Sequence, residues 1–116
     1  MDFKLLLRKT LSEIATLSRT YRDFENSIRR IGITPDEFHE LGIKYIVTHE
    51  HDLGTSFLFY NNEDEAKTSL LNWYNGRLNK NRKSTEHMDP DGTFAVIIFQ
   101  VGPYEQENHI FTLHVI

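Results

Sequence analysis

The stretch TFAVIIFQV, from Thr93 to Val101, is nearly continuous apolar sequence. Its apolar run of β-branched and aromatic residues is typical of a central strand that is covered on both faces. Gly102 and Pro103 end this strand, and the alternating tail from His109 to Ile116 predicts a closing strand beside it. We therefore expect a β-hairpin at the end of the chain, with the C-terminus inside the sheet.

A second hairpin is predicted upstream, between residues 43 and 60. The segment IKYIVTHEH at 43–51 has the composition of a strand, HDLGT at 51–55 supplies turn residues, and SFLFY at 56–60 forms the return strand. Two hairpins joined by short turns favour a four-stranded antiparallel sheet. Residues 80–92 show no periodicity, and we expect them to form an exposed loop.

The first helical pattern is the longest. Apolar residues recur at alternating spacings of four and three from Phe3 to Ile31, which predicts a long N-terminal helix. Either this helix extends beyond the sheet and pairs with a partner helix or with a second copy of the chain, or it bends near Thr16, Ser18 and Thr20. The apolar face of the 94–99 strand must also be covered, by this bent helix or by a second molecule.

Capping signals place two further helices. Thr34, Pro35 and Glu37 begin a short helix at about 35–41, which Gly42 ends. Asn62 caps a second major helix at about 63–79. Its core-facing stripe comprises Ala66, Leu70, Trp73, Tyr74 and Leu78. The prediction is a single α+β domain over 1–116, in which both long helices pack against one face of the sheet.

Composition excludes several classes of protein. The chain of 116 residues has no cysteine, so disulfides, thiolate metal sites and cysteine nucleophiles are absent. No apolar run approaches the ~20 residues that span a bilayer, and the N-terminus lacks an export signal. We therefore expect a cytoplasmic protein with no membrane partner.

Charge varies strongly along the chain. The net charge is −4, which disfavours nucleic acid as a general partner. Residues 35–76 carry two basic and eight acidic side chains, and residues 84–116 carry five acidic and no basic ones. Between them, residues 77–83 contribute four cations, which could contact phosphates near Trp73 and Tyr74 but also suit the C-terminal end of a helix. The two acidic regions favour a partner with a basic surface.

The motif whose side chains are best suited to metal binding or catalysis is THEHD at 48–52. On a strand, His49 and His51 point the same way while Glu50 and Asp52 point the opposite way. Two imidazoles at this spacing could bind a metal ion if His114 or His109 supplied a third ligand. The alternative is the polar end of an exposed hairpin. No nucleophile elbow or phosphate-binding glycine loop occurs, so we predict no catalytic residues and no cofactor.

These features predict a small, acidic, non-catalytic protein-binding module. We expect an immunity protein or inhibitor that neutralises a bacterial toxin, such as a nuclease, by covering its basic site. The alternatives are a phage inhibitor of host defence and a small metal-dependent enzyme using His49 and His51. The predicted partner-binding residues are acids and tyrosines near strand ends: Glu50, Asp52, Glu63, Asp64, Glu65, Tyr45, Tyr60 and Tyr104.

Overall fold

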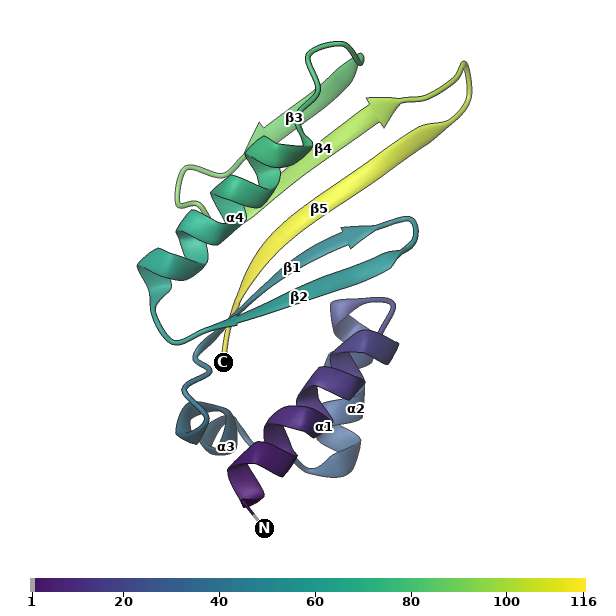
Figure 1. Cartoon of the computed structure of the whole chain (residues 1–116). Coiled ribbons are helices and arrows are strands. Elements are labelled where there is room, and N and C mark those ends of the chain that lie inside the picture. The colour runs from purple at the N-terminus through teal and green to yellow at the C-terminus, as the bar shows by residue number, and fades with distance from the viewer. Residues whose placement is uncertain (1) are drawn as a thin grey trace.

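The computed structural model describes residues 2–116 and contains helices and strands in an α+β arrangement. Three helices precede the first hairpin and a fourth separates it from the remaining strands (Figure 1). The elements are α1 (Phe3–Leu17), α2 (Tyr21–Ile31), α3 (Pro35–Glu40), β1 (Tyr45–His51), β2 (Gly54–Tyr60), α4 (Glu63–Arg77), β3 (Ser84–Met88), β4 (Phe94–Gln100) and β5 (Gln106–Val115).

The sheet has five antiparallel strands in the order β2-β1-β5-β4-β3. Both predicted hairpins are present, and β5 lies at the centre between β1 and β4, which confirms that the chain ends inside its own sheet. The prediction of four strands was wrong, because residues 84–88 form β3 within the segment expected to be a loop. These residues are mostly exposed, so pairing with the backbone of β4 holds them in place.

A continuous helix over 3–31 is also wrong, and the alternative of a bend near Thr16, Ser18 and Thr20 is closer, because the chain reverses between Leu17 and Tyr21. The hydroxyl of Ser18 donates to the carbonyl oxygen of Ile14 over 2.6 Å, and the side chain of Thr20 accepts from the backbone N–H of Asp23. Hydroxyl side chains compete in this way for backbone groups and end helices. The two pieces form a helical hairpin that keeps one apolar stripe facing the sheet.

The capping predictions hold for α3 and α4. Thr34 and Glu37 form a reciprocal capping box at the start of α3, and Asn62 caps α4. Gly42 follows α3 with a φ of +78°, a left-handed conformation that glycine adopts without strain. α4 ends at Arg77, before the predicted boundary, because Leu78 has extended backbone.

Helices cover both faces of the sheet, and not one face as predicted. Ile46 and Val47 are neighbours on β1, both 0% exposed, and they enter different cores. One core lies between the α1–α3 group and the β1–β2 hairpin, and it includes Leu11, Phe24 and Phe38. The other core lies beneath α4 and is built from strands β1, β4 and β5. β1 is therefore buried on both faces from Ile46 to His49, although its second half, THEH, is polar.

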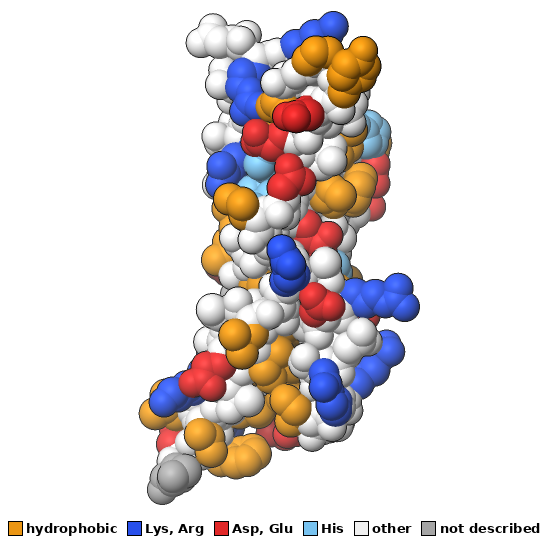
Figure 2. Space-filling model, turned by 90° about the vertical axis from the view of Figure 1, so that its right-hand side faces the viewer, with side chains coloured by type: hydrophobic (Ala, Val, Ile, Leu, Met, Phe, Trp, Pro, Cys, Tyr) orange, Lys and Arg blue, Asp and Glu red, His pale blue; other side chains and the backbone are white. Residues whose placement is uncertain are grey.

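The molecule is elongated, with principal extents of 53 × 28 × 19 Å. The α1–α3 group lies below the β1–β2 hairpin and leaves the outer side of β4 open (Figure 1). Phe94, Val96 and Ile98 therefore keep part of their surface exposed, so the bent N-terminal segment does not supply the cover expected there. Figure 2 shows acidic and basic side chains interspersed along one long face. Among residues 2–116, no helix combines the length and apolarity that crossing a membrane requires.

Candidate functional site

A groove of about 600 Å³ lies between β2 and α4. Its floor carries Leu58 and Tyr60 from β2, and its wall carries one side of α4. The α4 residues are Asp64, Glu65, Thr68, Ser69, Asn72 and Trp73. The groove thus combines two carboxylates with aromatic and aliphatic surface, a composition that suits the recognition of a basic protein segment.

Local interactions fix the position of α4 above β2. The side chain of Asn62 accepts from the backbone N–H of Glu65 over 3.0 Å and starts the helix directly after β2. The hydroxyl of Tyr60 then donates to Oγ of Ser69 over 2.7 Å. Ala66 and Leu70 are fully buried on the opposite side of α4, so the helix cannot rotate without exposing them.

The carboxylates of the groove carry uncompensated charge. Among the described residues, neither Asp64 nor Glu65 forms an ion pair, whereas Glu63 pairs with Lys67 across one helical turn at 3.1 Å. All three acids also interact favourably with the positive end of the helix dipole. That local role accounts for acids in the first turn, but not for the aromatic surface beside them.

A second groove of about 390 Å³ follows β2 on its other side. It lies between β2 and α1, where the helix presents only Ser12, Ala15 and Thr16. From β2 it is lined by Thr55, Ser56, Phe57 and Phe59. Small side chains on α1 leave this space open beside the edge of the sheet.

The structure brings together some of the predicted partner-binding residues. Tyr60, Asp64 and Glu65 line the α4–β2 groove, and Glu63 lies in the same helical turn. Sequence reasoning did not select Leu58, Thr68 or Asn72, and it placed Trp73 in the core-facing stripe. The side of α4 away from that stripe could have indicated Thr68 and Asn72.

The other predicted residues lie elsewhere. Glu50 accepts from the backbone N–H of Tyr21 over 2.8 Å and so anchors the start of α2. Asp52 is exposed in the turn between β1 and β2. Tyr45 is half-buried against the core beneath α4, while Tyr104 is 98% exposed in the turn between β4 and β5.

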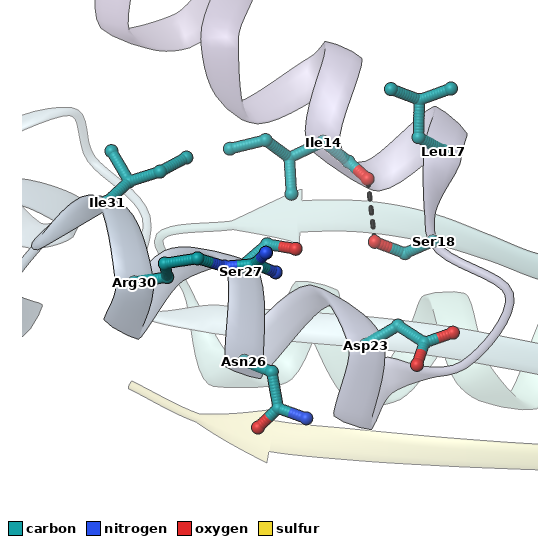
Figure 3. A pocket seen from close by; sticks show the side chains of 8 residues that line it. All are labelled: Ile14, Leu17, Ser18, Asp23, Asn26, Ser27, Arg30 and Ile31. Atoms are coloured by element: carbon teal, nitrogen blue, oxygen red, sulfur yellow. Dashed lines mark hydrogen bonds between the residues drawn. The ribbon is translucent and has the colours of Figure 1, made fainter.

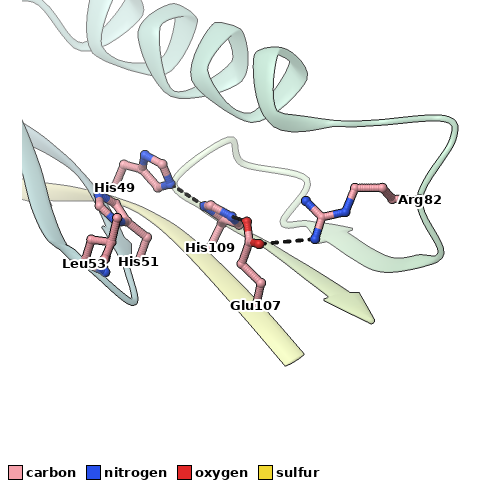
Figure 4. Close-up of polar contacts among 6 residues, drawn as sticks. All are labelled: His49, His51, Leu53, Arg82, Glu107 and His109. Carbon is pink, nitrogen blue, oxygen red and sulfur yellow. Dashed lines mark hydrogen bonds and ion pairs between the residues drawn. The ribbon is translucent and has the colours of Figure 1, made fainter. Parts of the chain in front are cut away.

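A chain of polar side chains crosses the sheet beneath α4 (Figure 4). Nε2 of His49 lies 2.8 Å from Nδ1 of His109, and Nε2 of His109 lies 2.7 Å from a carboxylate oxygen of Glu107. Arg82 donates to the other oxygen of Glu107 over 3.1 Å. The sequence could not indicate this chain, because strand register brings together residues 60 positions apart.

Electrostatics keep His49 neutral. Burial, followed by the nearby His109, His51 and Arg77, lowers the pKa of His49 to about 3. Hydrogen bonds from His109 and Arg82 hold the pKa of the Glu107 carboxyl below its usual value. His49 is 1% exposed and stacks on Phe111 with a centroid distance of 4.5 Å. Nε2 of His49 is therefore hydrogen-bonded within the protein and is shielded from a substrate.

Of the two candidates for a third metal ligand, His109 lies beside His49 and His51, with ring centroids 5.0 and 6.3 Å away, whereas His114 does not. His49 and His51 share a face as expected, with ring centroids 4.9 Å apart. His114 lies on the other face, where its ring stacks on that of Tyr21 with a centroid distance of 3.4 Å. Its Nε2 lies 2.9 Å from the hydroxyl oxygen of Thr48. Within residues 2–116, no group of three or more histidine, aspartate or glutamate side chains is placed to bind a metal ion.

The cations predicted at the end of α4 surround a polar cavity of about 350 Å³. Arg77, Lys80 and Arg82 line it, and Arg82 stacks on Phe99 with its guanidinium carbon 4.2 Å from the ring centroid. Trp73 and Tyr74 pack against the core, as the helical stripe predicted. These two rings are therefore not free to stack together on nucleic-acid bases.

A further groove of about 580 Å³ separates α1 from α2 (Figure 3). Ile14, Leu17 and Ile31 give it apolar surface, while Asp23 and Arg30 carry charge. Leu17 is 84% exposed and Ile31 is 57% exposed. This helical hairpin carries the surface that was predicted for pairing with a second copy.

The fold defines an α+β protein with helices on both faces of a five-stranded antiparallel sheet. Comparison of the chain with known protein families, with curated proteins and with solved structures finds no match.

Proposed function

We propose that this chain is a non-catalytic protein-binding module that holds a basic segment of a partner protein in the α4–β2 groove. The partner in this proposal is a toxin, such as a nuclease, whose basic site the chain covers. The observation that supports it is the juxtaposition of Asp64 and Glu65 with Leu58, Tyr60 and Trp73 in one groove. Aromatic anchors beside charge are the groups that dominate binding at protein interfaces.

The buried histidine chain supports a non-catalytic role. His49 is hydrogen-bonded to His109 and His109 to Glu107, and both imidazoles are buried beneath α4. A general base must reach the proton that it removes, within about 3 Å or through one water molecule. A neutral, enclosed His49 instead stabilises the packing of β1 against β5.

The experiment compares three forms of the chain as affinity baits in lysate of the native host. They are the natural sequence, the double variant Asp64→Asn/Glu65→Gln and the matched variant Glu63→Gln. Glu63 carries the same charge in the same turn but is paired with Lys67. We expect the natural sequence and Glu63→Gln to retain one stoichiometric protein that the double variant loses.

The recovered protein then tests the inhibitory role. If it is a toxin, its activity should fall to zero at equimolar addition of the chain, and nucleic acid should compete with the complex. Equal recovery by all three baits would contradict the proposed groove, and a partner without a basic site would contradict the inhibitory role.

Self-association through the α1–α2 hairpin is a second candidate function. The exposed apolar residues on this hairpin favour it, because exposed apolar surface of this kind is typical of interfaces. They include Phe3 and Leu6 on α1 in addition to Leu17 and Ile31. This surface lies apart from the α4–β2 groove, so both candidates could apply to one protein.

A further inference from the structure

β2 is an edge strand whose backbone faces solvent on one side. It lies at the end of the strand order, and it pairs with β1 through a register in which His51 opposes Gly54 across a two-residue turn. In such a ladder, every second residue exchanges hydrogen bonds with the partner strand. Thr55, Phe57 and Phe59 therefore direct their N–H and C=O groups away from β1.

The two edges of the sheet differ in how they are protected. Proteins usually protect an edge with a short strand, charged residues, proline or a bulge. β3, at one edge, is only five residues long and contains Glu86 and His87. β2, at the other edge, has seven residues, GTSFLFY, without charge or proline. An unprotected edge of this kind is a template for pairing with another strand.

The space beside β2 is open on both faces of the sheet. The α4–β2 groove lies on one face and the α1–β2 groove on the other, and together they hold residues 55–60 of β2. Side chains of a strand alternate between faces. A strand added to β2 would thus place alternate side chains into the two grooves, beneath α4 and above α1.

We propose that an extended segment of the partner protein, containing lysine or arginine at alternate positions, adds to β2 as a sixth strand of the sheet. This inference rests on the proposed function, because it specifies how the same partner binds. The basic side chains point to Asp64 and Glu65, and the intervening small or aliphatic side chains enter the groove lined by Phe57 and Phe59. Backbone pairing provides affinity and the two grooves provide selectivity.

Charge decides between a basic partner segment and a second copy of β2. The strand GTSFLFY carries no basic residue, so a second copy would leave Asp64 and Glu65 without counter-charges. A lysine-containing strand would neutralise both carboxylates. Because β2 itself carries no charge, this edge repels neither a basic nor an acidic strand.

The test uses an acetylated octapeptide of alternating lysine and valine. Trp73 is the single tryptophan of the chain and lines the α4–β2 groove, so its fluorescence reports binding. Amide hydrogen exchange measured by NMR reports pairing at Phe57 and Phe59, while the amides along β3 serve as the internal control. Two matched peptides complete the design: one is N-methylated at every backbone nitrogen, and the other has glutamate in place of lysine.

We expect the Lys-Val peptide to change Trp73 fluorescence and to slow exchange at Phe57 and Phe59 but not along β3. N-methylation should weaken binding by about tenfold or more, because several backbone hydrogen bonds are lost. The Glu-Val peptide should bind more weakly than the Lys-Val peptide.

Three results would overturn strand addition. The first is that the N-methylated peptide binds as tightly as the Lys-Val peptide. The second is that amide exchange at Phe57 and Phe59 stays unchanged with the Lys-Val peptide up to millimolar concentration. The third is that dimerisation of the free chain already protects these amides. None of these results contradicts the proposed function if recovery of a partner by the affinity baits still depends on Asp64 and Glu65. Recovery that is independent of those two acids would instead contradict the proposed function itself.

Discussion

The hydroxyl of Tyr60 donates a hydrogen bond to Oγ of Ser69 over 2.7 Å and joins the last residue of β2 to the middle of α4. Both residues line the groove that carries the proposed function. The contact therefore joins the two elements that form the groove.

Removing this hydrogen bond should lower stability modestly. We expect Tyr60→Phe and Ser69→Ala each to reduce the free energy of unfolding by about 1 kcal/mol, because a net hydrogen bond contributes about that much. The double variant should cost less than the sum of the single variants, since both remove the same contact. Urea unfolding of the four proteins measures the coupling, and strict additivity would show that the contact does not contribute.

Neutralising the groove acids should leave the fold intact. Asp64→Asn/Glu65→Gln should lower the free energy of unfolding by no more than about 2 kcal/mol, through weaker interaction with the helix dipole. Glu63→Gln should cost about 0.5 kcal/mol through loss of its exposed pair with Lys67. Thermal unfolding followed by circular dichroism checks both values. A collapse of the double variant would mean that these acids maintain the structure rather than bind a partner.

Stability should fall in mild acid because two histidines are buried in their neutral form. Burial lowers the pKa of His49 to about 3 and that of His114 to about 4, from 6.5. Below pH 6.5 the unfolded chain therefore binds protons that the folded chain does not. The contribution of the two neutral histidines to the free energy of unfolding is thus complete above pH 6.5 and is lost as the pH falls toward 4. At pH 4.5 the loss amounts to up to roughly 3 kcal/mol for each histidine.

Urea unfolding between pH 7 and 4.5 measures this dependence. His49→Gln should make it shallower, because the variant lacks one of the two buried neutral imidazoles. Stability that is constant over this range would contradict the neutral, buried state of His49.

The α1–α2 hairpin predicts concentration-dependent self-association. Leu17→Lys should abolish it, because a charge at an 84% exposed position would have to be buried in the interface, while the fold of the monomer should not change. Light scattering over a wide concentration range measures the effect. A natural-sequence chain that stays monomeric at millimolar concentration would remove this candidate.

Local signals predicted those parts of the fold that local chemistry determines. The capping residues Thr34 and Asn62 located two helix starts, and the apolar strands at 43–60 and 94–101 located both hairpins. β3 could not be predicted, because its mostly exposed side chains carry no alternation and its stability comes from backbone pairing with β4. The heptad spacing over 3–31 continued through a chain reversal because both helices face the same core.

The candidate site was only partly predictable for a related reason. Acids after Asn62 and a tyrosine at the end of β2 are visible in sequence, so Tyr60, Asp64 and Glu65 could be selected. The free edge of β2 depends on strand order, and the pairing of His49 with His109 depends on register across the sheet. Neither property is encoded by the spacing of neighbouring residues.

Site-specific photo-cross-linking in the native host can show whether a basic partner segment occupies the α4–β2 groove. A benzophenone side chain replaces Asn72, which lines the groove, or Leu71, which is exposed on the same helix outside it. We predict that position 72 cross-links to one protein through a peptide rich in lysine or arginine and that position 71 does not. Equal cross-linking from both positions, or capture at position 72 of a segment without basic residues, would contradict the account.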